Sequence, residues 1–421
     1  MLRTNLQRVN AQLASIVLFA LAVVLTHSAQ AQTFTVLHNF TGGGDGGVPF
    51  GGLTLDRTGN VYGTASAGGY TGNNCTAAGC GTVFKLTYRG SAWIFTPLYD
   101  FQGNNDGATP YAGVAIGPNG TLYGTTLLGG DEAGGTVFNL SPPARATGNV
   151  LGYWTETVLH QFSCASGNDG CSPVYGKVIF DPAGNIYGTT YQGGMACDDG
   201  SCGTVFKLTP SSGGGWTESV YDFPGRSGSG NPLSGVILDA SGNLYGATSD
   251  NNYAPVVYEL TPTGSGWTES VLYTFPFYQN PQGGLIYGGS GDILGTTLSL
   301  DVQNFGNAVY QLSPSSGQWS YIPLYNFGGN ANAGPWSGVV EGADGTLYGT
   351  TCGEGTFGNG SVFKLTPFQG GWTETDLYDF TGGDDGECPV GGMALDANGN
   401  IYGTAASGGS HGYGVVFEIT P

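Results

Sequence analysis

One short phrase occurs seven times in the chain: two hydrophobic residues, the second usually Tyr, followed by Gly and then Thr or Ala. Successive glycines of the phrase lie 49 to 64 residues apart, at Gly63, Gly124, Gly188, Gly246, Gly295, Gly349 and Gly403. A period in this range, carried by short strands and glycine-rich turns, is typical of several small sheets arranged around an axis. The repeat therefore constrains the fold far more tightly than it constrains the function.

The third copy shows what one repeat unit contains. Four segments with the period-2 alternation of strands fall at 176–181, 185–190, 203–209 and 216–223, separated by clusters of Gly, Pro, Asn and Asp. No segment of the unit has a convincing helical period. We therefore expect each unit to form one four-stranded antiparallel sheet, called a blade below, in an all-β protein.

The two ends of the repeat region complement each other. The last unit stops after its third strand, at 415–420, and the first unit is preceded by an isolated copy of a fourth strand, at 33–40. Pairing these two segments completes the seventh blade and removes an open sheet edge. We therefore predict a seven-bladed β-propeller that forms a single domain over residues 32–421. An open β-solenoid is the alternative, and the complementary ends argue against it.

Residues 1–31 have the pattern of a signal peptide. Arg3 and Arg8 precede an apolar run at 16–25, and the segment 29–31 (Ala-Gln-Ala) supplies a small-residue cleavage site. The run is shorter than the roughly 20 residues of a membrane span, although a retained signal anchor is an alternative. We expect cleavage before Gln32, no membrane insertion of the mature chain, and a secreted, periplasmic or cell-surface location.

The chain is strongly acidic, with 30 Asp and Glu against 10 Lys and Arg and a formal net charge of −20. Such a surface does not follow a phosphate backbone, so nucleic acid and anionic membranes are poor partners. The charge fits solubility outside the cell, or affinity for cations or neutral sugars.

All eight cysteines fall in two classes of loop, those joining second to third strands and those joining a fourth strand to the next blade. In a four-stranded meander these loops share one face of the disc, and they are the long, variable loops on which function usually lies. An even count in an exported chain predicts disulfides, which we pair as Cys75–Cys80, Cys164–Cys171, Cys197–Cys202 and Cys352–Cys388. A zinc site is disfavoured because CxxC spacing is absent and histidines are few.

Two further groups of residues on these loops are candidate sites. A Gly- and Asp-containing phrase before a Pro offers oxygen ligands for calcium, the one cofactor we consider, at Asp45, Asp106, Asp169 and Asp384. Asp-Gly is also an ordinary turn dipeptide, and turn chemistry is the stronger interpretation. Candidate ligand-binding residues are Asp131, Glu132, Asp198, Asp199 and Glu354, together with Trp336, the one tryptophan outside the fourth-strand register.

No motif of a known catalytic class is present: there is no GxSxG, HExxH or P-loop sequence. We therefore assign no catalytic residue. Two loop carboxylates at the right separation would suffice for acid/base chemistry on a glycan, but a solvated loop carboxylate is the better default. The six tryptophans that recur in fourth strands are interpreted as packing at the blade edges rather than as surface platforms for sugars.

The phrases together resemble the GloVer (Gloeobacter/Verrucomicrobia-type) tandem repeat of exported bacterial proteins. The resemblance rests on Gly-Asn-(Leu/Ile)-Tyr-Gly-Thr-Thr, Gly-Thr-Val-Phe-Lys-Leu-Thr-Pro and Leu-Tyr-Asp-Phe. It covers nearly all of the mature chain, and the fifth unit departs most, with Leu294 in place of Tyr. The resemblance implies export and supplies no established activity or catalytic residue.

The leading hypothesis is a monomeric, exported, non-enzymatic binding or scaffolding propeller. Its expected partner is a glycan or an extracellular or envelope protein, engaged through the cysteine-bearing loop face. The alternative is a polysaccharide hydrolase or lyase that uses loop carboxylates near the central channel. A third possibility is a purely structural envelope protein, which a loop face without a pocket would favour.

Overall fold

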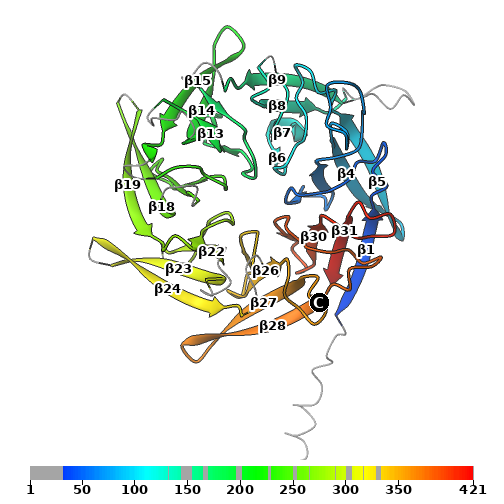
Figure 1. The fold of residues 1–421 in the computed structure, drawn as a ribbon, viewed down its shortest axis with the longest axis vertical. Coiled ribbons are helices and arrows are strands. Elements are labelled where there is room, and N and C mark those ends of the chain that lie inside the picture. Colours follow the sequence, from blue (N-terminus) through cyan, green and yellow to red (C-terminus); the bar gives the residue numbers. More distant parts are fainter. Residues whose placement is uncertain are drawn as a thin grey trace, which may run out of the picture.

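Seven small antiparallel sheets stand in a ring in the computed structural model of the chain (Figure 1). Apart from one 3₁₀ turn, η1 (Pro118–Gly120), the described residues form strands, turns and loops. No helix among them has the length and hydropathy of a membrane span. The structure describes residues 32–130, 132–143, 154–164, 169–195, 202–225, 229–249, 254–264, 266–289, 291–299, 306–315, 317–328 and 333–420.

The sheets are numbered as blades 1 to 7 in chain order. Blade 1 contains β2 (Thr54–Leu55), β3 (Val61–Ala65), β4 (Thr82–Arg89) and β5 (Ala92–Asp100). Blade 2 contains β6 (Ala115–Ile116), β7 (Leu122–Thr126), β8 (Thr136–Ser141) and β9 (Thr155–Gln161). Blade 3 contains β11 (Ile179–Phe180), β12 (Ile186–Thr190), β14 (Thr204–Pro210) and β15 (Trp216–Asp222). Blade 4 contains β16 (Ile237–Leu238), β17 (Leu244–Ala247), β18 (Val256–Thr263) and β19 (Gly266–Thr274).

The remaining blades follow the same plan. Blade 5 contains β21 (Ile286–Tyr287), β22 (Ile293–Ser299), β23 (Ala308–Ser315) and β24 (Gln318–Asn326), with a short extra strand β20 (Gln279–Asn280) paired to β22. Blade 6 contains β25 (Val340–Glu341), β26 (Leu347–Thr351), β27 (Ser361–Phe368) and β28 (Gly371–Asp379). Blade 7 contains β29 (Ala394–Leu395), β30 (Ile401–Ala405), β31 (Val415–Thr420) and β1 (Thr33–Asn39). A two-stranded pair, β10 (Gly170–Cys171) with β13 (Gln192–Gly193), lies in the loops of blade 3.

The predicted closure of the ring is confirmed. Strand β1 pairs antiparallel with β31, from Thr33 opposite Thr420 to Asn39 opposite Val415, and so completes the sheet β1-β31-β30-β29. The blue N-terminal strand and the red C-terminal strand therefore lie side by side in Figure 1. The fold is a seven-bladed β-propeller, as the repeat predicts.

The first strands are shorter than the sequence predicts. The strand expected at 176–181 is reduced to the two residues of β11. Closer to the axis the blades touch one another: the Leu53 amide donates to the Gly392 carbonyl of the neighbouring blade at 3.2 Å. At this boundary a backbone group near the axis therefore bonds between blades, and the ladder of blade 1 begins farther out, at β2.

The repeated glycine makes room for an aromatic ring of its own blade. A Cβ on Gly188 would lie 2.4 Å from Cζ of Phe206 on β14, and the other six glycines meet the ring of their third strand at 2.2 to 2.7 Å. The absence of a Cβ at this position therefore lets the aromatic side chain of the paired strand lie against the backbone. The rings are completely buried, at Phe84, Phe138, Phe206, Tyr258, Tyr310, Phe363 and Phe417.

The threonine and tyrosine of the same phrase join neighbouring blades. The Thr64 hydroxyl donates to the carbonyl of Ala112 in the next blade at 2.9 Å, and Thr189 donates to Ser234 at the same distance. Tyr62 packs in a core cluster with side chains of blade 2, and Trp154 covers that cluster from its edge. All six fourth-strand tryptophans pack in this way against clusters between blades, namely Trp93, Trp154, Trp216, Trp267, Trp319 and Trp372.

Candidate functional site

Three of the four predicted disulfides are present, and they lie on the predicted loop face. The bonds are Cys75–Cys80, Cys164–Cys171 and Cys352–Cys388. Cys202 is also disulfide-bonded, and its predicted partner, Cys197, lies outside the described residues. The bond Cys352–Cys388 connects the β26–β27 loop of blade 6 to the loop that enters blade 7. These loops form what we call the cysteine-bearing face.

The four aspartates considered as calcium ligands occupy the turns that follow outer strands. The amides of Thr41, Gln102 and Ser163 donate to one carboxylate oxygen of Asp45, Asp106 and Asp169, respectively, at 2.9 to 3.1 Å. In blade 7 the Thr381 amide donates to Asp385 at 2.8 Å, so the structural counterpart is Asp385 and not the predicted Asp384. Each of these carboxylates closes a turn, and calcium binding remains a prediction.

The same carboxylates hold a side chain of the preceding strand. The rings of His38 and His160 and the hydroxyls of Tyr99 and Tyr378 contact Asp45, Asp169, Asp106 and Asp385, respectively. Each of these four residues stands two positions before a buried Phe. In all seven blades, the residue two positions before this Phe contacts a side chain on the outer strand of the next blade.

The seven contacts between outer strands are of two kinds. Three are aromatic stacks, His38 on Phe95, Phe34 on Tyr378, and Tyr273 on Tyr321. Four pair a Tyr or His with a glutamate of the next blade: Tyr99 with Glu156, His160 with Glu218, Tyr221 with Glu269, and Tyr325 with Glu374. Burial raises the pKa of Glu156 and Glu374 to about 7, and it raises the pKa of Glu218 as well. We call the seven contacts between outer strands joints, and the three joints that contain Glu156, Glu218 and Glu374 are therefore sensitive to pH.

One joint has the donor atoms of a metal site. The ligand atoms of His160, Asp169 and Glu218 lie within 4.8 Å of one another. The His160 Nε2 atom is 3.3 Å from both an Asp169 oxygen and a Glu218 oxygen. A divalent ion suits this donor set. However, the corresponding positions of the other six joints hold stacked rings and Tyr–Glu contacts, so we interpret the triad as one of seven packing joints.

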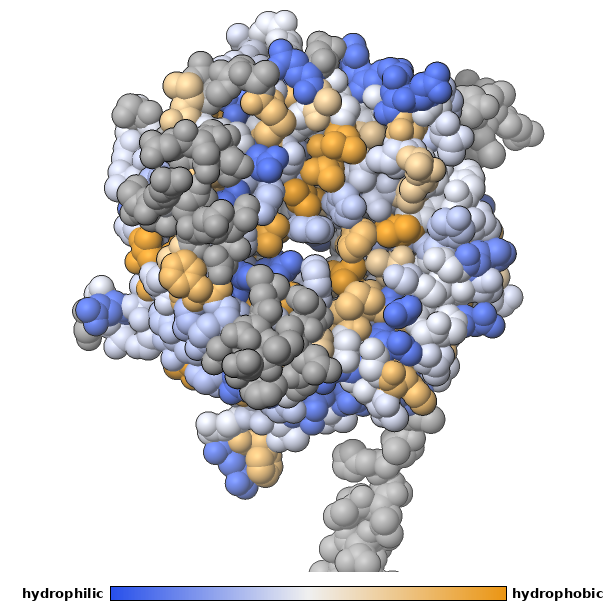
Figure 2. All heavy atoms as spheres, viewed as in Figure 1, coloured by the Kyte–Doolittle hydropathy of each residue, from blue (hydrophilic) through white to orange (hydrophobic). Residues whose placement is uncertain are grey.

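A cavity of about 280 Å³ occupies the centre of the ring. The residues that lead into the first strands line it, and each blade contributes the same register position to its outermost layer. That layer, called the mouth below, consists by register of Phe50, Tyr111, Tyr175, Leu233, Gln282, Trp336 and Val390. All of them except Tyr111 line the cavity, and the Tyr111 ring packs between those of Phe50 and Tyr175. Each of these residues follows a loop of the cysteine-bearing face, so the mouth opens on that face. Figure 2 shows hydrophobic side chains around the central hollow.

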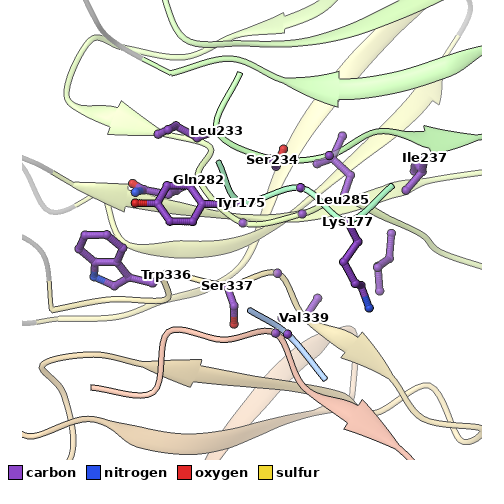
Figure 3. A pocket seen from close by; sticks show the side chains of 18 of the residues that line it. Tyr175, Lys177, Leu233, Ser234, Ile237, Gln282, Leu285, Trp336, Ser337 and Val339 are labelled. Carbon is purple, nitrogen blue, oxygen red and sulfur yellow. The ribbon is translucent and has the colours of Figure 1, made fainter. Parts of the chain in front are cut away.

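Aromatic side chains dominate the mouth. The ring of Phe50 lies 4.9 Å from that of Tyr111, and the ring of Tyr111 lies 5.7 Å from that of Tyr175. Tyr175 remains 40% exposed although it stands in the cavity wall. Figure 3 shows Trp336, Gln282 and Tyr175 together at one end of the cavity. The predicted ligand-binding residue Trp336 thus lies in the wall of the central cavity.

The next layer of the cavity contains one exceptional side chain. Six blades place glycine there, at Gly52, Gly113, Gly235, Gly284, Gly338 and Gly392, whereas blade 3 places Lys177. The Lys177 ammonium lies 3.4 Å from the Thr54 hydroxyl of blade 1, across blade 2. Surrounding protein atoms lower the pKa of Lys177, although the lumen leaves the side chain accessible to solvent. Lys177 was not among the residues predicted from the sequence, although the equivalent pair of residues is a small residue followed by Gly in six units and Gly-Lys in the third.

The predicted loop carboxylates do not meet in the cavity. Glu132 accepts a hydrogen bond from Ser163 at the boundary of blades 2 and 3. Glu354 stands in blade 6, where burial and the nearby Asp376 raise its pKa. Asp131, Asp198 and Asp199 lie outside the described residues. Among the described residues that line the cavity there is neither an Asp nor a Glu.

Comparison with known families accounts for the repeat. A family model described as the Gloeobacter/Verrucomicrobia repeat matches residues 22–155, 73–276 and 251–421. The chain belongs to this repeat family. The family resemblance predicted from the seven phrases is therefore confirmed. A search of curated proteins gave no significant sequence match to this repeat-family chain.

Solved structures are similar to the chain at low sequence identity. PorZ, an essential bacterial surface component of the type-IX secretion system of Porphyromonas gingivalis, is 14% identical with a TM-score of 0.53. The match covers 89% of this chain but only 46% of PorZ, so the repeat-family chain spans about half of that protein. A Bacteroides fragilis protein assigned as a 6-phosphogluconolactonase is 12% identical with a TM-score of 0.47, over 90% of this chain and 89% of that one. At these identities the likeness to PorZ concerns the fold alone.

Proposed function

We propose that this protein is an exported, non-enzymatic binding propeller that takes a glycan at the mouth of its central cavity. The observation that carries the proposal is the composition of the mouth. At one register position, four of the seven residues are aromatic, namely Phe50, Tyr111, Tyr175 and Trp336, and all of these except Tyr111 line the cavity.

Aromatic side chains in an open hollow suit the apolar faces of sugar rings. Tyr and Trp offer a large, rigid contact surface at a low cost in conformational entropy, together with a polar group at the edge. Gln282 adds an amide donor and acceptor beside Trp336. A mostly apolar wall with a few polar groups is the usual composition of a small-ligand site.

The disulfides in the loops around the mouth support a binding role, because they hold these loops in place. Three disulfides lie in the loops of the same face, and one of them, Cys352–Cys388, cross-links a loop of blade 6 to the loop that enters blade 7. Disulfides persist in oxidising compartments, which supports a location outside the cytoplasm. The cavity wall lacks a described carboxylate pair, so the alternative of a glycoside hydrolase gains no support from this site.

The proposal is tested by affinity electrophoresis and calorimetry of residues 32–421 with a panel of soluble plant and microbial polysaccharides. We expect retardation by at least one neutral polysaccharide, and the variant Trp336→Ala to weaken that binding about tenfold or more because it removes a stacking surface. The control is Phe368→Ala in the same blade, since Phe368 is 61% exposed and does not line the cavity.

Two results contradict the proposal. Equal binding by the wild type and the Trp336 variant moves the site away from the mouth. New oligosaccharide fragments after incubation identify an enzyme instead of a binding protein.

A further inference from the structure

The central cavity contains a lysine at a position that is glycine in the other six blades. In six blades the residue two positions after the mouth residue is glycine, which leaves the lumen open. In blade 3 that residue is Lys177, and its side chain passes Gly113 of blade 2, where an added Cβ would lie 3.1 Å from the Lys177 Cδ atom, to bring its ammonium within 3.4 Å of the Thr54 hydroxyl of blade 1. Figure 3 shows its amine pointing away from the end of the cavity at which Trp336 and Tyr175 lie.

The Lys177 ammonium has no carboxylate beside it in the described structure. The described residues that line the cavity with it include no Asp or Glu, its ammonium contacts the Thr54 hydroxyl, and the ion pairs of the described residues do not involve it. By contrast, Lys85 and Lys207 lie over the rings of Tyr62 and Tyr187. The lumen leaves the Lys177 side chain accessible to solvent, so its ammonium donors are open to a ligand that enters the cavity. An anionic group in the lumen would pair with this ammonium.

We propose that the lumen binds a slim glycan carrying a single carboxylate, with the aromatic mouth holding sugar rings and the Lys177 ammonium holding the acid. This inference rests on the proposed function and names its ligand class. The ammonium of lysine forms a charge-assisted hydrogen bond with a carboxylate oxygen, a stronger bond than one between neutral groups.

The dimensions of the cavity limit the shape of the ligand. Two residues of extended chain separate Tyr175 in the mouth from Lys177, a rise of about 7 Å, and the lysine side chain reaches farther from the mouth. A ligand that contacts both the rings and the ammonium is therefore extended, and the glycine layer admits a narrow chain. The volume of about 280 Å³ suits a short segment of a glycan rather than a folded partner.

The charge of the whole protein limits the charge of the ligand. With a formal net charge of −20, the protein repels a polyanion such as a polyuronate at long range. One carboxylate on an otherwise neutral chain suffers little of this repulsion, because its contact with Lys177 is short-ranged. A glycan with an isolated acidic residue is thus favoured over a densely acidic polymer.

The test compares cellobiouronate with cellobiose, which differ at one end by a carboxylate, by calorimetric titration of the mature chain. Three proteins are measured: the wild type, Lys177→Met, which keeps the length of the side chain, and Lys177→Gly, which restores the residue of the other six blades. We expect the wild type to prefer the acidic sugar about tenfold or more. Both variants should lose this preference while they bind cellobiose as the wild type does.

The outcomes separate this inference from the proposed function. Binding of both sugars without preference, or an unchanged preference in Lys177→Met, overturns the role of the lysine and leaves the aromatic mouth intact. A lack of binding by either sugar overturns the ligand class in both proposals. Tighter binding of a short neutral peptide with a free C-terminal carboxylate, in competition with cellobiouronate, overturns the assignment to a glycan.

Discussion

The contact between the repeated glycine and the ring above it predicts the effect of one added methyl group. In Gly188→Ala the new Cβ would lie 2.4 Å from Cζ and 2.8 Å from Cε1 of Phe206, about 1 Å inside an ordinary carbon–carbon contact of roughly 3.5 Å. Phe206 is completely buried and packs against Phe162 at 5.2 Å, so its ring has little room to move. Overpacking of this kind costs about 1–3 kcal/mol of unfolding free energy.

The thermal midpoint should fall by a few degrees. At about 2.1 cal/mol/K per residue the mature chain has an unfolding entropy of roughly 0.8 kcal/mol/K, so a cost of about 2 kcal/mol lowers Tm by about 2–3 °C. Circular dichroism melting measures this shift. The control is Gly213→Ala, whose Cβ meets no atom within 4 Å and which should stay within about 0.5 kcal/mol of wild type.

A double-mutant cycle identifies the cause of the loss. The variant Phe206→Leu removes the ring edge that the added methyl group would meet, so Gly188→Ala should cost less in that background, with a coupling of about 1 kcal/mol. The reasoning is refuted if Gly188→Ala melts like Gly213→Ala, or if its cost is the same in the Phe206→Leu background.

The joints, turns and closure of the ring carry further predictions. The free energy of unfolding should rise by about 3 kcal/mol in total as the pH falls from 8 to 5, with about 1 kcal/mol from each of the half-buried carboxyls of Glu156, Glu218 and Glu374 after solvent screening. The reason is that burial raises the pKa of these carboxyls in the folded state, so the folded state binds protons at a pH where the unfolded state does not. Melting that is unchanged over this range contradicts the assignment. Asp385→Ala should lower stability by about 1–2 kcal/mol through the lost turn bonds, whereas Asp384→Ala should be neutral, and equal melting of the two variants rules out the turn assignment. Replacing Cys352 and Cys388 by Ser removes a cross-link over 36 residues and should lower the free energy of unfolding by about 2–4 kcal/mol. Chemical denaturation measures this loss, with the reduced wild type as the reference. Deleting residues 32–40 exposes the edge of β31 and should cause concentration-dependent association in analytical ultracentrifugation, and a monodisperse monomer would show that β1 does not protect this edge.

Much of the fold follows from local sequence patterns. The alternation of each repeat, its turn residues, the fourth strand missing from the last unit and the extra strand before the first unit predict four-stranded blades and their closure, because strands, turns and edges obey short-range rules. The disulfide pairs follow from the same logic, since loops of one face bring cysteines together. Short-range rules did not predict that the first strands shrink to two residues. That shortening arises where neighbouring blades converge on the axis and share hydrogen bonds.

The candidate site was only partly predictable. Trp336 stood out because it breaks the register of the other tryptophans, and the structure places it at the mouth of the cavity. The partners of that residue did not stand out, since Phe50, Tyr111 and Tyr175 are far apart in sequence and become neighbours only when seven blades close around an axis. The shift from Asp384 to Asp385 has the same origin, because only the hydrogen bond to the Thr381 amide distinguishes the two neighbouring carboxylates.

The sequence by itself determined the repeat, the number of blades and the loop face that carries the disulfides, because each of these depends on spacing along the chain. The tertiary structure alone decided which side chains share the central cavity. A single lysine in a sequence rich in glycine attracts no notice until six glycines surround it. The physical reason is that a site on a symmetry axis takes one residue from each repeat, so its chemistry resides in the differences between repeats that are otherwise alike.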